Sequence, residues 1–210
     1  MPASIAALPI DPVKKVPVPW FVMWIDGKPE FRIMDGKKVS RCLPERLCWT
    51  CGQKLNNRVS FIVGPMCIVN RISGEPPSHP ECAAYSVRAC PFLSRPNMVR
   101  RTGGLPMHAY KEPGFLDRNP GVSCIWTTKR PGAQQFVNGS SLLFEMYPPT
   151  VLSFWVEGRP ATQEEVDDSV ANGLPTLQRM ADEQGNGAPE YLSRKVKSAL
   201  PLFQLNRCTT

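Results

Sequence analysis

Two pairs of metal-binding residue types lie near the middle of the chain. Cys48 and Cys51 form a Cys-x2-Cys pair, and His79 and Cys82 form a His-x2-Cys pair 27 residues further on. A Cys-x2-Cys turn places two thiolates on one edge of a tetrahedron, and Gly52 permits the tight turn. Residues three apart at the start of a helix project from one face. The spacing therefore predicts one Zn²⁺ held by four protein ligands. Such a closed shell is structural, because catalysis needs an open coordination position.

Other uses of the cysteines remain open. Cys48 and Cys51 could instead form a reduced redox pair, but a thioredoxin-type motif requires a strand and a βαβ unit around it, and no such pattern is visible. Cys67 and Cys90 are reserve ligands should one assignment be wrong. Buried packing is the favoured interpretation for both of them. The same interpretation applies to the three other cysteines, Cys42, Cys124 and Cys208.

The segments around the two pairs predict a particular local fold. Residues 59–63 and 66–69 are apolar runs flanking Gly64-Pro65 and are expected to form a hairpin. A helix is expected over about 79–89, capped by Ser78 and stopped before Pro91. In treble-clef zinc fingers, a Cys-x2-Cys turn (the zinc knuckle), a hairpin and a ligand-bearing helix follow one another in this order. Residues 46–90 thus resemble a treble clef, and the resemblance implies that the hairpin brings the two ligand pairs together.

The remaining pattern is typical of an α+β protein with short elements. The 23 prolines are about twice the average usage and favour many turns. Strands are expected at 19–25, 30–34, 122–128, 141–146 and 151–156, although the last of these segments is equally compatible with the start of a short helix. Helices are expected at 37–47, 162–172, 175–184 and 189–200. We accordingly expect an extended N-terminal arm (1–18), an α+β core that contains the zinc module (19–160) and a helical C-terminal section (161–210).

Positive charge is concentrated in the part of the chain that carries the metal motif. Residues 1–130 hold 19 Lys and Arg against 9 Asp and Glu, whereas residues 131–210 hold 6 against 9. This asymmetry is compatible with a polyanionic partner such as DNA or RNA, or simply with a solvated basic surface. Trp49 could stack on a base or cover the metal as packing. The candidate phosphate-binding residues are Arg58, Arg71, Arg95, Arg100, Arg101 and Arg118.

The sequence gives little support for catalysis. It contains two histidines, and if His79 binds zinc, only His108 remains as an acid–base candidate, with Asp117 and the arginines near it. Treble clefs also host His-Asn-His nucleases, but these need a catalytic histidine besides metal-binding histidine or acidic residues, and His108 alone would remain for that role. No P-loop, dinucleotide or nucleophile-elbow fingerprint is present. A hydrolytic enzyme is the least favoured function.

Two further classes of partner are disfavoured. No run of eighteen apolar residues exists and the N-terminus lacks a signal-peptide pattern, so we expect no membrane association and a cytoplasmic protein with reduced cysteines. Residues 162–172 and 175–184 superficially resemble a helix-turn-helix. Both predicted helices are acidic, whereas DNA readers present cations there. Packing or a protein interface is the favoured role.

Several distinctive blocks resemble a family of bacteriophage and prophage proteins of unknown role. They are Pro19–Val22, Trp24–Pro29, Cys48–Gly52, Phe61–Cys67, Glu75–His79, Ala89–Leu93, Arg118–Gly121, Glu157–Thr162 and Gly173–Pro175. The resemblance implies action in the cytoplasm of a bacterial host and brings no established reaction. With the charge asymmetry, it favours a zinc-binding accessory protein that binds a macromolecule, preferably nucleic acid. The alternative is a protein-interaction factor that modulates a host enzyme or defence system.

Overall fold

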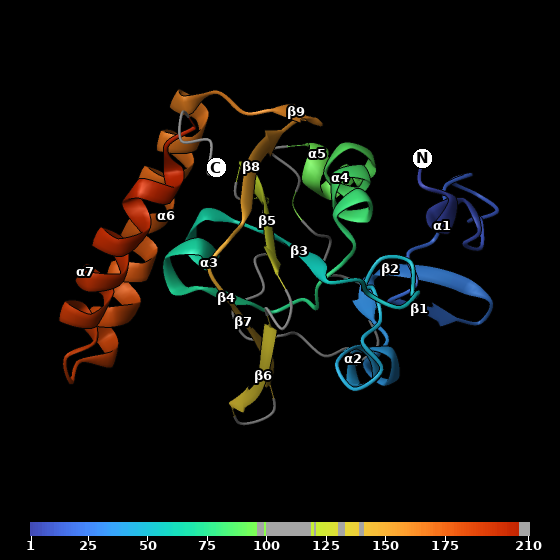
Figure 1. Ribbon diagram of the computed structural model, residues 1–210, viewed down its shortest axis with the longest axis horizontal. Coiled ribbons are helices and arrows are strands. Elements are labelled where there is room, and N and C mark those ends of the chain that lie inside the picture. The colour runs from blue at the N-terminus through green and yellow to red at the C-terminus, as the bar shows by residue number, and fades with distance from the viewer. Residues whose placement is uncertain (96–98, 100–118, 120, 130–132, 139–140, 206–210) are drawn as a thin grey trace.

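The computed structural model of the chain describes residues 1–95, 99, 119, 121–129, 133–138 and 141–205 (Figure 1). It confirms the α+β class, because antiparallel sheets form the centre and helices surround them. The N-terminal elements lie at one end of the long axis, and the two C-terminal helices lie at the other (Figure 1). The N-terminal elements and the C-terminal helices are therefore well separated in the molecule.

The main sheet has four antiparallel strands in the order β3-β5-β8-β9. Its strands are β3 (Arg58–Val63), β5 (Ser123–Lys129), β8 (Val151–Val156) and β9 (Arg159–Pro160). β5 lies between β3 and β8, and its first six residues are all buried. Burial on both faces fits its apolar and threonine-rich composition, because such a strand has no solvated side.

Each face of this sheet is covered by a different layer. Phe61, Trp126 and Phe154 point into the larger core, which is completed by α3 (Pro65–Asn70), α6 (Gln163–Gln184), α7 (Ala188–Ala199) and η1 (Leu200–Phe203). Ile125 and its neighbour Ile62 face the opposite side and pack against α4 (Pro80–Ala89). This alternation of faces along each strand is the period-two pattern of a sheet buried on both sides.

Two smaller sheets flank the main one. The hairpin of β1 (Val22–Ile25) and β2 (Lys28–Met34) turns at Asp26-Gly27, both of which have positive φ. This is the backbone that an Asp-Gly hairpin turn favours. The other small sheet has the order β4-β7-β6. Its strands are β4 (Ile72–Ser73), β6 (Ala133–Asn138) and β7 (Ser141–Met146). Two short helices, α2 (Gly36–Cys42) and α5 (Pro91–Ser94), follow β2 and α4 in the chain.

The predicted hairpin of residues 59–63 and 66–69 is wrong. Residues 59–63 belong to β3 and pair with β5, whereas 66–69 lie in helix α3. Gly64 is the N-cap and Pro65 occupies the first turn, where its missing N–H and fixed φ suit a helix. The cysteine turn and the ligand-bearing helix of a treble clef are present, but β3, the short helix α3 and β4 lie between them in place of the hairpin. The treble-clef prediction therefore fails at its middle element.

The C-terminal section is helical, as predicted, but it contains two long helices where three were expected. α6 runs without interruption from Gln163 to Gln184, so Asn172-Gly173 does not end a helix and no helix-turn-helix exists there. Gly173 fits under the Met66 side chain, because a Cβ at that position would lie 2.8 Å from Cε of Met66. Pro175 is exposed within the helix. Burial of Val166 and Val170 against the core keeps the helix continuous despite the proline.

The N-terminal residues are not a wholly extended arm. α1 (Ala3–Ala6) forms one helical turn, and the side chain of Ile5 is buried. Beyond it, Ile10 and Pro17 form a β-bridge, and the Asp11 carboxylate accepts hydrogen bonds from the N–H groups of Val13 and Lys14. The segment is thus a folded part of the molecule. The division of the chain at 18 and 160 stays a prediction.

Candidate metal centre

Cys48 and Cys51 lie in a tight turn between α2 and β3. Gly52 donates its N–H to the carbonyl of Cys48, and Cys48 donates its N–H to the carbonyl of Gln53. An antiparallel bridge between Leu47 and Lys54 closes the turn below the cysteines. Gly52 has φ +73, a conformation that glycine adopts readily. The chain therefore doubles back between Leu47 and Lys54 and presents both thiols on one side.

The second pair comes from the start of α4. His79 is the N-cap residue, Pro80 occupies the first turn and Cys82 lies within the first turn of the helix. The cap is His79 and not the predicted Ser78, whose backbone instead exchanges both hydrogen bonds with Ser60 of β3. Hence the main sheet fixes the entrance to α4, and α4 brings its two ligands to the cysteine turn.

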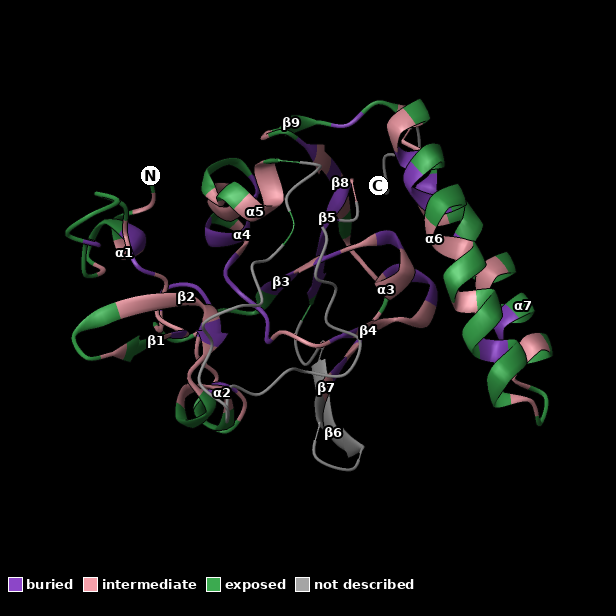
Figure 2. Ribbon diagram, turned by 180° about the vertical axis from the view of Figure 1, so that it is seen from behind, coloured by how far each residue is buried: buried purple, intermediate pink, exposed green. Residues whose placement is uncertain are grey.

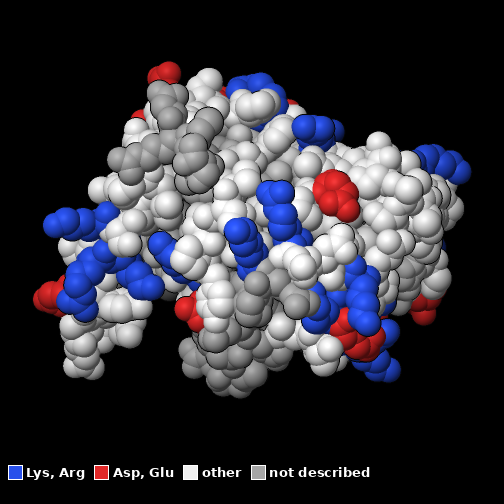
Figure 3. All heavy atoms as spheres, in the orientation of Figure 1, with Lys and Arg blue, Asp and Glu red and all other residues white. Residues whose placement is uncertain are grey.

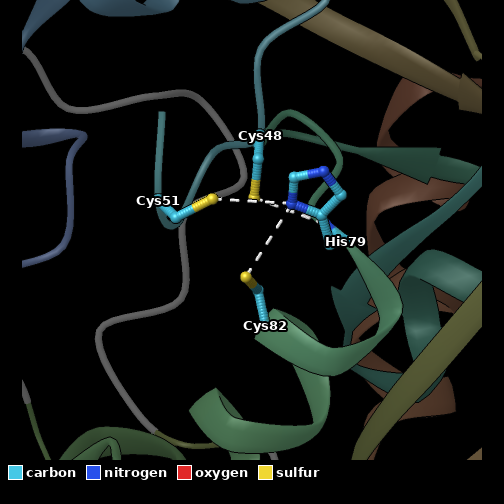
Figure 4. Close-up of side chains that lie close together, drawn as sticks. All are labelled: Cys48, Cys51, His79 and Cys82. Atoms are coloured by element: carbon cyan, nitrogen blue, oxygen red, sulfur yellow. Dashed lines mark hydrogen bonds between the residues drawn. The ribbon is translucent and has the colours of Figure 1, made fainter. Parts of the chain in front are cut away.

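The four side chains converge, as Figure 4 shows, with the two sulfurs of Cys51 and Cys82 directed at the His79 ring. Their ligand atoms all lie within 4.8 Å of one another, and all four residues are buried. The His79 Nδ1 atom lies 3.5 Å from Sγ of Cys51 and 3.9 Å from Sγ of Cys82. A tetrahedral zinc with bonds of about 2.0–2.3 Å has ligand-to-ligand edges of roughly 3.5–3.8 Å. The residues fit a Cys₃His zinc site.

Backbone groups orient the ligands. The Nε2 atom of His79 lies 2.9 Å from the carbonyl oxygen of Lys54, so the protonated Nε2 donates to it and Nδ1 stays free to bind a metal. The N–H of His79 donates to Sγ of Cys48 at 3.3 Å. A hydrogen bond of this kind stabilises negative charge on the sulfur. Ser4 Oγ lies 3.6 Å from Sγ of Cys82 and adds a contact from α1.

The metal-free cluster shares its protons unevenly. Hydrogen bonds from the Cys51 thiol, and then from Cys82, lower the pKa of Cys48 below the ordinary thiol value. The hydrogen bond between Cys82 and the Cys48 sulfur is the main cause that raises the pKa of Cys82. A hydrogen bond between His79 and the same sulfur is the main cause that raises the pKa of His79 to about 10. Metal binding requires thiolates and a neutral imidazole, so it releases protons from these groups.

Aromatic side chains enclose the turn. A Cβ on Gly52 would lie 2.6 Å from the Trp20 ring, so the indole rests directly on this glycine. Trp49 is 3% exposed and stacks on Phe21 with ring centroids 4.3 Å apart. Trp49 therefore covers the site as packing, and the interpretation that it stacks on a base is wrong.

The other cysteines do not join this group within the described residues. Cys67 lies on α3, and burial raises its pKa to about 11. Cys90 is the residue between α4 and α5, and Cys42 and Cys124 are buried elsewhere. Cys208 lies outside the described residues. The role of Cys67 and Cys90 as reserve ligands thus has no geometric support.

The candidate phosphate-binding arginines are dispersed. Arg58 begins β3 and is exposed, and Arg95, just after α5, is also exposed. Arg71 has its guanidinium 5.7 Å from the centre of the Trp126 ring, which gives it a packing role. Arg100, Arg101 and Arg118 lie outside the described residues, as do His108 and Asp117. In Figure 3, Lys and Arg side chains are spread over the visible face and outnumber Asp and Glu there.

Two parts of the site were missed by sequence reasoning. The contacts from Ser4 and Ile5 come from a segment far away in the chain, and no local pattern predicts that it returns to the cysteines. The Lys54 carbonyl is a backbone group and leaves no sequence signal at all. Its place could have been suspected only from its position three residues after Cys51, within the turn.

Comparisons with protein-family models, with curated proteins and with solved structures find no match to this chain. The resemblance to bacteriophage proteins therefore stays a prediction. Among the helices of the described ranges, none has the length and apolar character needed to cross a membrane. What the structure does provide is a four-residue group that could hold a metal ion.

Proposed function

We propose that the chain binds one structural Zn²⁺ through Cys48, Cys51, His79 and Cys82, and that it is a phage-encoded accessory protein whose basic surface binds nucleic acid. The convergence of the four ligand atoms within 4.8 Å supports the metal part. Three thiolates and one imidazole are a ligand set that suits zinc, and four protein ligands leave no open position for catalysis. The metal would fix the cysteine turn against α4.

The nucleic-acid part is supported by two cations at one end of the neighbouring strands β3 and β5. Arg58 and Lys129 are directly opposite each other in the β3–β5 register, and both are exposed. Within the described residues neither forms an ion pair. Like charges placed directly opposite in a sheet destabilise it. A bound phosphate would relieve this repulsion, and the strongly basic residues 1–130 supply the surrounding positive field.

The candidate zinc site lies close in sequence to one of these cations, Arg58. Lys54, whose carbonyl contacts His79, precedes Arg58 by four residues. Zinc binding would hold the cysteine turn against α4, and this would restrict the motion of the first residues of β3. In this proposal the metal orders the binding surface and takes no part in chemistry.

Binding to labelled single-stranded and double-stranded DNA, measured by fluorescence anisotropy over a range of salt concentrations, tests this part. Wild type is expected to bind with affinity that falls as salt rises. The double variant Arg58→Ala with Lys129→Ala should bind more weakly, and the slope of log K against log salt should decrease by about 1–2, one unit for each lost phosphate contact.

A matched control removes two cations from the other end of the molecule. Arg179→Ala with Arg194→Ala lowers the net charge equally but changes α6 and α7, so it should leave the slope nearly unchanged. Equal losses in both double variants would mean that only net charge matters, and absence of any binding by wild type at low salt would contradict the nucleic-acid proposal. Either result would leave the zinc assignment intact and favour a protein partner.

A further inference from the structure

The C-terminal helices enclose an apolar groove on the side of the molecule away from the zinc site. The groove has a volume of about 460 Å³ and runs between α6 and α7. Leu174, Val196 and Leu200 supply its apolar surface, whereas Leu192, which also lines it, is only 7% exposed, and Lys197 stands at its α7 margin. Leu200 is 49% exposed. Figure 2 shows that the far ends of both helices carry mainly exposed and half-buried residues. Such a groove is a candidate docking surface.

The two helices carry opposite charge. α6 contains six carboxylates and one arginine, whereas α7 contains three cations and one glutamate. Two copies of α6 would therefore repel each other, while α7 of one copy is attracted to α6 of another. Two cations of α7, Arg194 and Lys195, gather around the Tyr191 ring of their own helix. Neither residue lines the groove, so repulsion between these cations of two copies does not prevent a second α7 from packing there.

One pair of charges on α7 is self-complementary: Lys197 lines the groove, and Glu190 lies outside its lining, about two turns earlier on the same helix. Glu190 and Lys197 are both exposed and stand seven residues apart, which places them on one line of the helix about 10 Å apart. When two such helices run antiparallel about a two-fold axis near residues 193 and 194, Glu190 of each copy faces Lys197 of the other. A two-fold interface forms every such pair twice.

We propose that the groove is filled by a second copy of this chain, with the two α7 helices packed antiparallel and each in contact with the α6–α7 groove of the other. The apolar residues of the two grooves are then buried together in a four-helix arrangement. The acidic α6 helices lie outermost and apart. The zinc site of each copy remains at the opposite end and free for a partner.

A charge-exchange experiment tests this arrangement by sedimentation equilibrium of the full, zinc-loaded chain. Wild type should sediment as a dimer at micromolar concentration. Lys197→Glu places Glu against Glu190 of the other copy, and Glu190→Lys places Lys against Lys197, so each single variant should weaken association about tenfold or more. The double variant Glu190→Lys with Lys197→Glu restores opposite charges and should return the affinity to nearly that of wild type.

A second pair of variants tests the apolar contact. Leu200→Glu puts a charge in the groove and should abolish the dimer, whereas Ser198→Glu adds the same charge at an exposed position that does not line the groove and should not. Circular dichroism confirms that each variant is folded. A monomeric wild type, a dimer that Leu200→Glu leaves intact, or a double charge exchange that fails to restore association would each overturn the proposal.

Discussion

The zinc region and the main core are built on different amounts of apolar burial. Among the residues that the structure describes, the cluster around the candidate metal contains four buried residues, Ile5, Cys48, Cys51 and Cys82, and three of these are candidate ligands. The main core contains nineteen buried residues in the same described part of the chain, including Trp126, Phe61 and Phe144. Full burial of a large apolar side chain contributes about 1.5–3 kcal/mol, so the main core can support itself.

This difference in apolar burial indicates what a bound metal would contribute. Without zinc, the cysteine turn and α1 would depend on few apolar contacts and on hydrogen bonds between thiols. Structural zinc in small peptides binds with about 10–16 kcal/mol of apparent free energy, which exceeds what the small cluster can supply. We therefore expect the zinc region to fail when the metal is removed and the main core to fail when its own side chains are truncated.

The largest effect is expected from loss of a ligand. Cys82→Ser removes a thiolate from the closed shell. Loss of a hydrogen bond that only supports a ligand already lowers metal affinity by up to about 100-fold, so loss of the ligand itself should lower zinc affinity by at least about that factor. Because Ser4 contacts this sulfur and Ile5 packs on the cluster, the N-terminal segment should also become accessible to proteases. Competition with a chromogenic chelator and limited proteolysis measure the two effects.

Cys90→Ser is the matched control, since the residue ends the same helix and lies outside the ligand group. It should retain wild-type zinc affinity and protease resistance. If Cys90→Ser lost zinc as strongly as Cys82→Ser does, the ligand assignment would be wrong.

A smaller but still large effect is expected in the main core. Trp126 is fully buried on β5, and its indole N–H donates to the carbonyl of Tyr147 at 2.8 Å. Trp126→Ala leaves a cavity and should lower the free energy of unfolding by about 3–5 kcal/mol. Urea denaturation measures the loss, with the more exposed Trp24→Ala as the control. At low urea the folded Trp126→Ala protein should still bind zinc, and loss of zinc there would show that the two regions are not separate.

The smallest effect concerns the junction between the sheet and the C-terminal helices. The side chain of Glu165 pairs with Arg159 at 2.6 Å and accepts the N–H of Thr162 in a capping box. The Arg159 hydrogen bond is the main reason that the pKa of Glu165 falls to about 2. Because this folded-state pKa is depressed, the contribution to stability is complete above the ordinary value of 4.5 and is lost as pH falls from there toward 2.

Glu165→Gln should accordingly be less stable than wild type at pH 7 by a modest amount, and the difference should close as pH falls below about 4.5. Thermal unfolding of both proteins across this pH range measures the gap. Zinc bound at the proposed site would be released from both proteins on acidification, so the stability difference between them is the quantity to compare. A gap that is unchanged from pH 7 to pH 3 would contradict the assigned role of this carboxylate.

The parts of the structure that the sequence predicts are those set by local spacing. Cys48 and Cys51, like His79 and Cys82, are close enough that a turn and a helix start place each pair. The Asp26-Gly27 hairpin and the helix at 188–199 were likewise predictable from turn chemistry and helical period. Residues 66–69 were mispredicted because a short apolar run has no period that separates a strand from a buried helix.

Long-range packing accounts for the rest. Pro175 is a helix breaker in isolation, but burial of the α6 face that carries Val166 and Val170 outweighs the one hydrogen bond that it removes. The return of Ser4 and Ile5 to the cysteines likewise depends on contacts across more than seventy residues, and no local pattern encodes them. Of the six candidate arginines, Arg58 and Arg95 are exposed, and Arg71 packs on Trp126.

The zinc assignment is tested most sharply by the metal content of the purified, folded chain. Elemental analysis by inductively coupled plasma mass spectrometry should give about one zinc per chain for wild type and for Cys90→Ser, and nearly none for Cys82→Ser. A folded wild-type protein, shown by circular dichroism to retain its helices after purification without chelator in zinc-supplemented medium, that carries no zinc would contradict the central claim.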